Sequence, residues 1–271
     1  MKSDPTSNNS SAGGQLDRDM ALRLAKALRA SSEELFELIH DPATEVLRNL
    51  LKNPDLTEEH LLALLKRTDL SEELLQAIHN LQKPEKSHRL RLAMARNPAT
   101  PAPVVITIMP HLYLFELLDL CILPGVPPDQ RLAAERQITQ RLPEIPLGNK
   151  LTLARRAPPG LLGALLREGE PRIVQTCLDN PRLPESALHL YLRSGKPTPD
   201  SLSQIARHRR WGTYPRVRLA ILKHPRTPAI WFTLWLKNIP VGELRGLAMK
   251  RNLGQAQRNV IQDEMKRRGL R

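Results

Sequence analysis

The sequence predicts an all-α protein built of stacked two-helix repeats, an α-solenoid, and three observations support this prediction. Leucine dominates the apolar residues, with 49 Leu against 21 Ile and Val together, and leucine favours helices whereas β-branched residues favour strands. The 271 residues include 24 Pro, and prolines in a helical protein collect at helix starts, where the missing N–H costs nothing. So many prolines indicate many short helices. The third observation is an internal repeat.

Four segments of the sequence align without gaps, each anchored on a proline: Pro54, Pro98, Pro181 and Pro225. An apolar residue recurs eight and four positions before each anchor, and a spacing of four places both residues on one face of a helix. This helix is expected to end just before the proline, which disfavours the α conformation there. The residue at that point is Asn53, Asn97, Asn180 or His224. Because asparagine tolerates the left-handed conformation, it is expected to form a helix C-cap.

A second helix is expected after each anchor. Thr100-Pro101 and Thr227-Pro228, like Thr198-Pro199 elsewhere, fit an N-cap followed by proline at the first helical position. Each unit is therefore a helix, a tight turn and a second helix. A two-helix unit cannot bury its apolar stripe alone and must stack on its neighbours, which is the defining property of an α-solenoid.

The elements follow from this repeat in order along the chain. A Ser/Asn/Gly-rich leader over residues 1–16 is expected to be disordered, and a single solenoid domain over 17–271 follows it. Its first helix, within 31–40, carries acidic residues at its N-terminus, where they complement the helix dipole. The anchors are 44, 83 and 44 residues apart, which indicates a unit of about 42 residues and one degenerate copy at 150–168. The remaining predicted elements are the units at 45–66, 89–110, 172–193 and 216–237, and helices at 71–81, 129–142, 201–208, 244–250 and 255–268.

Residues 89–109 and 216–237 resemble leucine-rich repeat variant units. These are short α-solenoid repeats with the core V-R-x-x-x-A/L-x-N/H-P-x-T-P-x-x-x-L, similar in architecture to HEAT and armadillo repeats. The resemblance covers about a third of the chain and implies a right-handed solenoid with a general role as a binding scaffold. Units of that family follow each other at about half the spacing seen here, which implies an extra helix between copies. Some members carry a cysteine-ligated iron–sulfur cluster, which the two distant residues Cys121 and Cys177 cannot supply.

The net charge of +13 is unevenly distributed. Residues 1–150 hold 18 Lys and Arg against 20 Asp and Glu, whereas residues 151–271 hold 23 against 8. The solenoid therefore has a near-neutral half, 17–150, and a strongly basic half, 151–271. A surface this basic attracts polyanions such as nucleic acid or an acidic protein. The alternative is a soluble, arginine-rich surface without a partner.

The densest candidate binding site is the segment 206–218, in which five arginines surround two aromatic residues. Guanidinium groups match phosphate or carboxylate bidentately, and an adjacent aromatic ring can stack on a base. The predicted polyanion-binding residues are Arg207, Arg209, Arg210, Trp211, Tyr214, Arg216, Arg218, Lys250, Arg251, Lys266, Arg267 and Arg268. The competing interpretation is structural: Trp211 and Tyr214 wedge between repeats, and Arg216 and Arg218 occupy repeat positions also held by Arg89 and Arg91.

Catalytic and cofactor motifs are missing from the sequence. It contains no P-loop, G-x-G-x-x-G, H-E-x-x-H or G-x-S-x-G motif, so we predict no catalytic residue, no metal site and no cofactor. With two cysteines the chain has no disulfide framework, and both are expected to be buried. The N-terminus lacks the apolar stretch of a signal peptide, which predicts a cytoplasmic protein.

The predicted function is a non-enzymatic scaffold for a macromolecular partner, with the basic half contacting an acidic protein or DNA or RNA. Two alternatives remain. A DNA glycosylase-type enzyme, by analogy with HEAT-like solenoids, would use Asp200 with Trp211, Trp231 and Trp235, although the last two are expected in the core. A membrane-surface adaptor would use the apolar segment 104–123, but Pro110, Glu116 and Asp119 favour two buried helices there and no transmembrane span.

Overall fold

The structure is a computed structural model that describes residues 10–81 and 87–270, with side chains from residue 18 onward. Its secondary structure over these ranges is helical, with α-helices, short 3-10 turns and no strand. The prediction of an all-α protein is confirmed. The chain divides into two compact units, unit 1 over residues 1–137 and unit 2 over residues 138–271.

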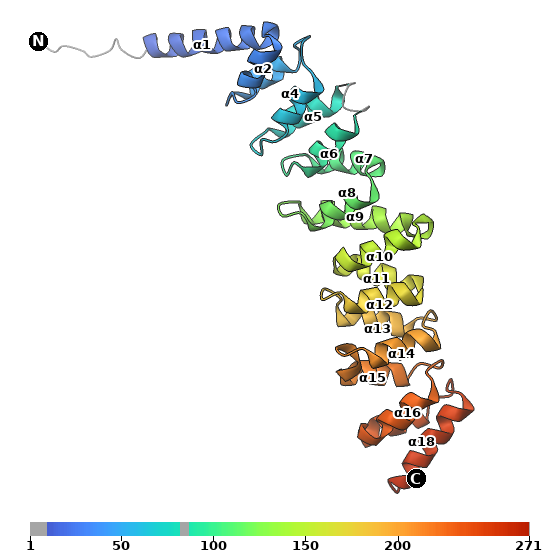
Figure 1. Ribbon diagram of the computed structural model, residues 1–271. Helices are drawn as coiled ribbons and strands as arrows, with labels where there is room; N and C mark the ends of the chain where they lie inside the picture. The colour runs from blue at the N-terminus through green and yellow to red at the C-terminus, as the bar shows by residue number, and fades with distance from the viewer. Residues whose placement is uncertain (1–9, 82–86, 271) are drawn as a thin grey trace, which may run out of the picture. The chain divides into compact units, whose positions relative to one another are not determined.

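The helices are short and follow each other closely in both units (Figure 1). Unit 1 contains α1 (Ser10–Arg29), α2 (Ser32–Leu38), α3 (Thr44–Leu50), α4 (Glu58–Leu64), α5 (Glu72–Asn80), α6 (His88–Arg96), α7 (Ala102–Ile108), the 3-10 turn η1 (Met109–His111), α8 (Leu114–Ile122) and most of α9 (Pro128–Arg141). Unit 2 contains η2 (Leu142–Glu144), α10 (Leu147–Arg156), α11 (Pro159–Glu168), α12 (Pro171–Asp179), α13 (Glu185–Arg193), α14 (Pro199–Arg207), η3 (Trp211–Thr213), α15 (Pro215–Leu222), α16 (Ala229–Trp235), η4 (Leu236–Asn238), α17 (Val241–Ala248) and α18 (Gln255–Arg267).

Within each unit a helix packs mainly on the second helix before it. In unit 1, α3 contacts α1 and α5, while α4 contacts α2 and α6. In unit 2, α12 contacts α10 and α14, while α13 contacts α11 and α15. Odd-numbered and even-numbered helices therefore form two adjoining rows in each unit. Leucines from both rows fill the interior between them, among them the fully buried Leu61 and Leu188.

Prolines mark the helix starts, as the composition predicts. Five helices begin with proline: Pro128, Pro159, Pro171, Pro199 and Pro215. The Thr100-Pro101 and Thr227-Pro228 pairs depart from the prediction, because each proline precedes the first helical residue. The Thr100 and Thr227 hydroxyls instead donate to Met94 O at 2.7 Å and Ile221 O at 2.5 Å, so they close the preceding helix.

The two units have the same order of elements. Equivalent residues of unit 1 and unit 2 differ by a constant residue number, the difference between Pro54 and Pro181. We call it the duplication offset. Every helix from α11 to α18 starts at this offset from its counterpart among α2 to α9, so that Ser32 corresponds to Pro159. The last residues of α1 and α10 are related in the same way. No insertion or deletion interrupts this correspondence.

The internal contacts repeat at the duplication offset as well. Gln130 at the start of α9 donates to Thr100 O, and its counterpart Gln257 in α18 donates to Thr227 O. The first bond joins α9 to the turn before α7, and the second joins α18 to the turn before α16. Unit 2 therefore repeats the element order and these contacts of unit 1, and we call this repetition the duplication.

The asparagine before an anchor proline joins neighbouring helices of one row. Asn53 Nδ2 donates to Ala27 O at 2.9 Å, and Asn180 Nδ2 donates to Ala154 O at 2.8 Å. Asn97 makes the same contact with Leu65 O. We call this contact the turn clasp. It corrects the expected left-handed C-cap, because no described residue other than glycine has a positive φ.

The order of the helices accounts for the spacing of the anchors, including the extra helix expected between copies. Pro54, Pro98, Pro181 and Pro225 follow α3, α6, α12 and α15, so the shorter of the two anchor spacings covers three helices. Every second helix belongs to the same row, so two helices that are three places apart, such as α3 and α6, lie in different rows. The units that are similar in sequence therefore alternate between the rows. Helix α1 was not expected. It begins at Ser10, inside the segment 1–16 assigned to a leader, and residues 1–9 lie outside the described ranges.

The apolar segment 104–123 contains two helices, α7 and α8, separated by η1 at Pro110. Val105, Ile108, Leu117 and Leu118 are buried. The described residues hold no helix that combines the length and apolar character needed to cross a bilayer.

Candidate binding groove

Two of the predicted arginines lie against tryptophans of α16. The guanidinium carbon of Arg207 is 6.0 Å from the centre of the Trp231 ring, and that of Arg218 is 5.4 Å from the Trp235 ring. Arg218 Nε also donates to Gly212 O. Both tryptophans are buried, as expected of core residues. These arginines therefore cover the core as well as carrying charge.

Arg210, Trp211 and Tyr214 form one cluster around η3. Trp211 is fully buried and its Nε1 donates to Leu178 O at 3.1 Å, which matches the structural interpretation of this residue. Arg210 stacks on the Trp211 ring at 4.2 Å and donates to Pro181 O. Tyr214 packs at 5.5 Å from Trp211 and is 37% exposed. Arg209 is exposed.

The basic residues near the C-terminus serve partly as helix caps. Arg267 and Arg268 both pair with the buried Glu264, and their hydrogen bonds lower the pKa of that carboxyl to about 2. Arg268 also donates to Ile239 O and Lys237 O. Lys250 donates to Lys223 O, while Arg251 and Lys266 are exposed.

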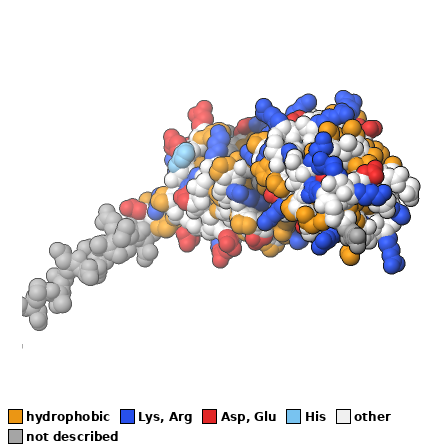
Figure 2. Space-filling view, turned by 90° about the horizontal axis from the view of Figure 1, so that it is seen from below, with side chains coloured by type: hydrophobic (Ala, Val, Ile, Leu, Met, Phe, Trp, Pro, Cys, Tyr) orange, Lys and Arg blue, Asp and Glu red, His pale blue; other side chains and the backbone are white. Residues whose placement is uncertain are grey.

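Only two of the predicted residues line a common groove. At the C-terminal end of the molecule, Lys and Arg side chains are interspersed with hydrophobic ones, and few Asp or Glu side chains lie between them (Figure 2). Of the twelve predicted residues, the structure brings Arg216 and Lys250 together with five cationic or imidazole side chains that were not predicted. These seven line a single groove.

The groove lies between α13 and α15 and has a volume of about 1050 Å³. We call it the basic groove. Leu190, Leu192, Leu219 and Ala220 form its apolar floor. Its charged and imidazole side chains are His189, Arg193, Arg216, Lys223, His224, Arg226 and Lys250. No Asp or Glu is among the described residues that line it.

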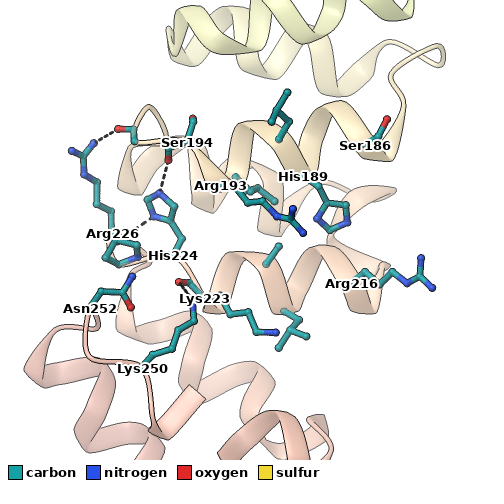
Figure 3. Close-up of a pocket in the computed structure, with 16 residues that line it drawn as sticks. Ser186, His189, Arg193, Ser194, Arg216, Lys223, His224, Arg226, Lys250 and Asn252 are labelled. Carbon is teal, nitrogen blue, oxygen red and sulfur yellow. Dashed lines mark hydrogen bonds between the residues drawn. The ribbon is translucent and has the colours of Figure 1, made fainter. Parts of the chain in front are cut away.

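Hydrogen bonds fix one end of the basic groove. His224 Nδ1 accepts from Arg226 N at 3.2 Å, so its Nε2 donates to Ser194 O at 3.4 Å (Figure 3). This is the turn clasp with histidine in place of asparagine. Burial and the charge of Arg226 lower the pKa of His224, while the Ser194 hydrogen bond opposes them. The Arg226 side chain donates to Gly195 O at 3.1 Å.

The charges in the rest of the groove are less constrained. Lys223 pairs with Glu243 at 3.1 Å, and His189 contacts Glu185 on its own helix at 3.0 Å. Figure 3 shows His189 and Arg193 projecting from α13 on the side of α15, and Arg216 at the start of α15. Arg193 and Arg216 are exposed, and no carboxylate of the described residues lies within ion-pair distance of either. These two guanidinium groups are available to a ligand.

The structure offers little to the enzymatic alternative. Trp211, Trp231 and Trp235 are each at most 8% exposed, so none stands beside Asp200 as a surface on which a base could stack. No group of three or more His, Cys, Asp or Glu within the described ranges could hold a metal ion. Cys121 and Cys177 are buried, and burial raises the pKa of each thiol to about 12, which keeps both in the unreactive thiol form.

Sequence reasoning missed Ser186, His189, Arg193, Lys223 and Arg226. They lie outside the densest basic segment, and α14 and η3 separate α13 from α15 along the chain. Aligning the chain on itself at the duplication offset could have drawn attention to them.

No protein-family model matches this chain, and comparisons with curated proteins and with solved structures found no match.

Proposed function

We propose that this chain is an α-solenoid binding protein and that unit 2 binds an acidic macromolecule. The alternation of helices between two rows supports the solenoid, as do the turn clasps between neighbours of one row. The resemblance of residues 89–109 and 216–237 to leucine-rich repeat variant units favours the right-handed stacking of that family. Stacked repeats present an extended surface that suits macromolecular partners.

One observation carries the binding role: the basic groove holds five Lys and Arg and two His over an apolar floor, without an acidic side chain among its described lining residues. The low dielectric of the groove walls concentrates the electric field of these basic side chains. The positive potential in the groove attracts polyanions. The groove also accounts for part of the charge asymmetry, because most of the basic excess of the chain falls in unit 2.

Anisotropy titrations of the full chain test this function. Labelled polyglutamate, duplex DNA and single-stranded RNA serve as probes at about 50 and 200 mM salt. We expect at least one probe to bind at low salt with an affinity that falls as salt rises, because ion pairs with the groove are screened. Failure of all three probes to bind at low salt would overturn the proposal.

A further inference from the structure

Unit 1 contains a groove at the position equivalent to the basic groove. It lies between α4 and α6 and has a volume of about 620 Å³. We call it the unit 1 groove. Of the thirteen described residues that line it, all but Phe36 correspond at the duplication offset to residues that line the basic groove, among them Arg89 to Arg216, Leu92 to Leu219 and Pro98 to Pro225. The duplication thus provides an internal reference for the basic groove.

The first difference concerns the arginine at the groove edge. In unit 1, Arg89 Nη1 lies 2.8 Å from Glu59 Oε1 and 3.8 Å from a Glu58 oxygen. In unit 2, Ser186 stands at the position of Glu59, and Glu185, the counterpart of Glu58, contacts His189 instead. Ser186 and Arg216 lie at the same end of the basic groove (Figure 3). The carboxylate that neutralises Arg89 therefore has no counterpart beside Arg216.

The second difference concerns a bulky side chain. Phe36 lines the unit 1 groove and packs on His60, with ring centres 4.3 Å apart. The corresponding residues of unit 2 are Gly163 and Ala187, and neither carries a ring. The basic groove is the larger of the two, with about 1050 against 620 Å³. Unit 2 lacks both an acidic and an aromatic group that unit 1 supplies to its own groove.

The third difference is that unit 2 has cationic and imidazole side chains where unit 1 has aliphatic ones. Unit 2 has His189, Arg226 and Lys250 where unit 1 has Leu62, Ala99 and Leu123. All three substitutions raise the capacity of the groove to hold an anion. Unit 1 also has Glu59 beside Lys66, Arg89 and Arg96, whereas unit 2 has Ser186 at the position of Glu59, so the basic groove carries more unbalanced positive charge than the unit 1 groove.

From these differences we infer that the basic groove binds an acidic polypeptide segment, which places a carboxylate beside Arg216 and a bulky apolar side chain in the groove. This inference rests on the proposed binding function and names its partner. The carboxylate would make the charge-assisted contact that Glu59 makes with Arg89. The apolar side chain would be buried against the leucine floor, which contributes binding energy through the hydrophobic effect.

The lining of the groove favours a polypeptide over nucleic acid. Single-stranded nucleic acid is held by aromatic side chains on which its bases stack, and no Phe, Tyr or Trp is among the described residues that line the basic groove. Leu190 is 58% exposed at the floor, which suits an apolar side chain better than a phosphate.

Binding of a labelled synthetic peptide to the full chain tests the inference. The peptide consists of glutamates with phenylalanine at every third position, and a second peptide has alanine in place of phenylalanine. Ser186→Glu recreates the unit 1 arrangement by placing a carboxylate beside Arg216. Position 186 is the second residue of α13, where a glutamate suits the helix dipole, so the variant should fold. We expect Ser186→Glu and Arg216→Ala each to weaken binding about tenfold, the effect of one lost charge-assisted contact.

Matched variants control for net charge and for arginine loss. Gln262→Glu makes the same charge change as Ser186→Glu on an exposed position of α18, and Arg172→Ala removes an exposed arginine that holds the same repeat position as Arg216. Both should bind the peptide as tightly as the native chain does.

The inference would be overturned if Ser186→Glu and Arg216→Ala bound the peptide as tightly as the native chain. Equal affinities of the native chain for the two peptides would also overturn it. Binding of DNA or RNA without peptide binding would also overturn it, while the proposed polyanion binding would stand. Failure of every probe would overturn both.

Discussion

At the residue scale, the turn clasp explains why asparagine or histidine precedes the anchor proline. A side chain at this point must accept from the backbone N–H two residues ahead and donate to a carbonyl of the neighbouring helix. Asn97 does so through Oδ1 and Nδ2, and His224 does so through Nδ1 and Nε2. Both residues are buried, so loss of either bond would leave an unpaired polar group inside the protein.

Histidine makes this clasp sensitive to pH, whereas asparagine does not. Protonation of His224 would put a hydrogen on Nδ1, which now accepts from Arg226 N. Burial and the charge of Arg226 lower the pKa of His224 in the folded protein, while an unfolded histidine titrates at about 6.5. Below about pH 6.5 the unfolded chain binds the proton first, so the free energy of unfolding falls as pH drops towards the folded pKa.

We expect His224→Asn to remove this dependence, because asparagine forms the same clasp at every pH. Urea denaturation of the native chain and the variant between about pH 7.5 and 5 measures the difference. The native chain should lose stability relative to the variant as pH falls. Parallel stability curves for the two proteins would contradict the prediction.

At the element scale, the sequence predicts helix positions better than helix neighbours. The apolar spacing and the prolines locate α3, α4, α6, α7, α12, α13, α15 and α16 because these signals are local. The turn clasp of Asn53 reaches back to Ala27 at the end of α1, and nothing in a local pattern identifies that partner. Residue type alone predicts a left-handed cap for asparagine. Its observed role depends on a contact between helices, which residue type does not specify.

The connection between α14 and α15 shows how tightly such contacts are packed. Gly212 N donates to His208 O at 2.8 Å, and a Cβ added to Gly212 would lie 2.2 Å from Ala206 O. Because that oxygen belongs to the backbone, the last turn of α14 would have to move. The η3 turn that carries Gly212 also holds the buried Trp211.

We expect Gly212→Ala to lower the free energy of unfolding by about 1–3 kcal/mol, the usual cost of forcing extra atoms into a packed interior. Gly246→Ala is the matched control, because a Cβ at this position in α17 meets nothing within 4 Å. This control should be neutral or stabilising by up to about 1 kcal/mol, since alanine favours helix. Denaturant midpoints measure both effects. Equal midpoints for the two variants would refute the steric argument.

At the scale of the whole molecule, the charge asymmetry can be predicted from the sequence, but the basic groove cannot. The residues of the groove become apparent in the sequence only when the two units are compared. One offset relates Pro54 to Pro181 and Pro98 to Pro225, but the shorter spacing between Pro54 and Pro98 indicates a smaller repeat in the sequence. The twelve basic and aromatic residues predicted from local density include only Arg216 and Lys250 of the groove. The others of that set cap helices, cover tryptophans or stand apart, because density along the chain does not specify a shared surface.

The same comparison predicts that the unit 1 groove can be converted into a second binding site. Glu59→Ser frees Arg89 of its closest carboxylate, and Phe36→Ala removes the ring that lines the groove. We expect this double variant to bind two acidic peptides per chain where the native chain binds one. The new site should be the weaker, because unit 1 has Leu62, Ala99 and Leu123 where unit 2 has three basic side chains. Isothermal titration calorimetry gives the stoichiometry, and Glu45→Ser, which removes an exposed acidic residue away from the groove, is the control. A stoichiometry that stays at one in a folded double variant would show that Glu59 and Phe36 are not what closes the unit 1 groove.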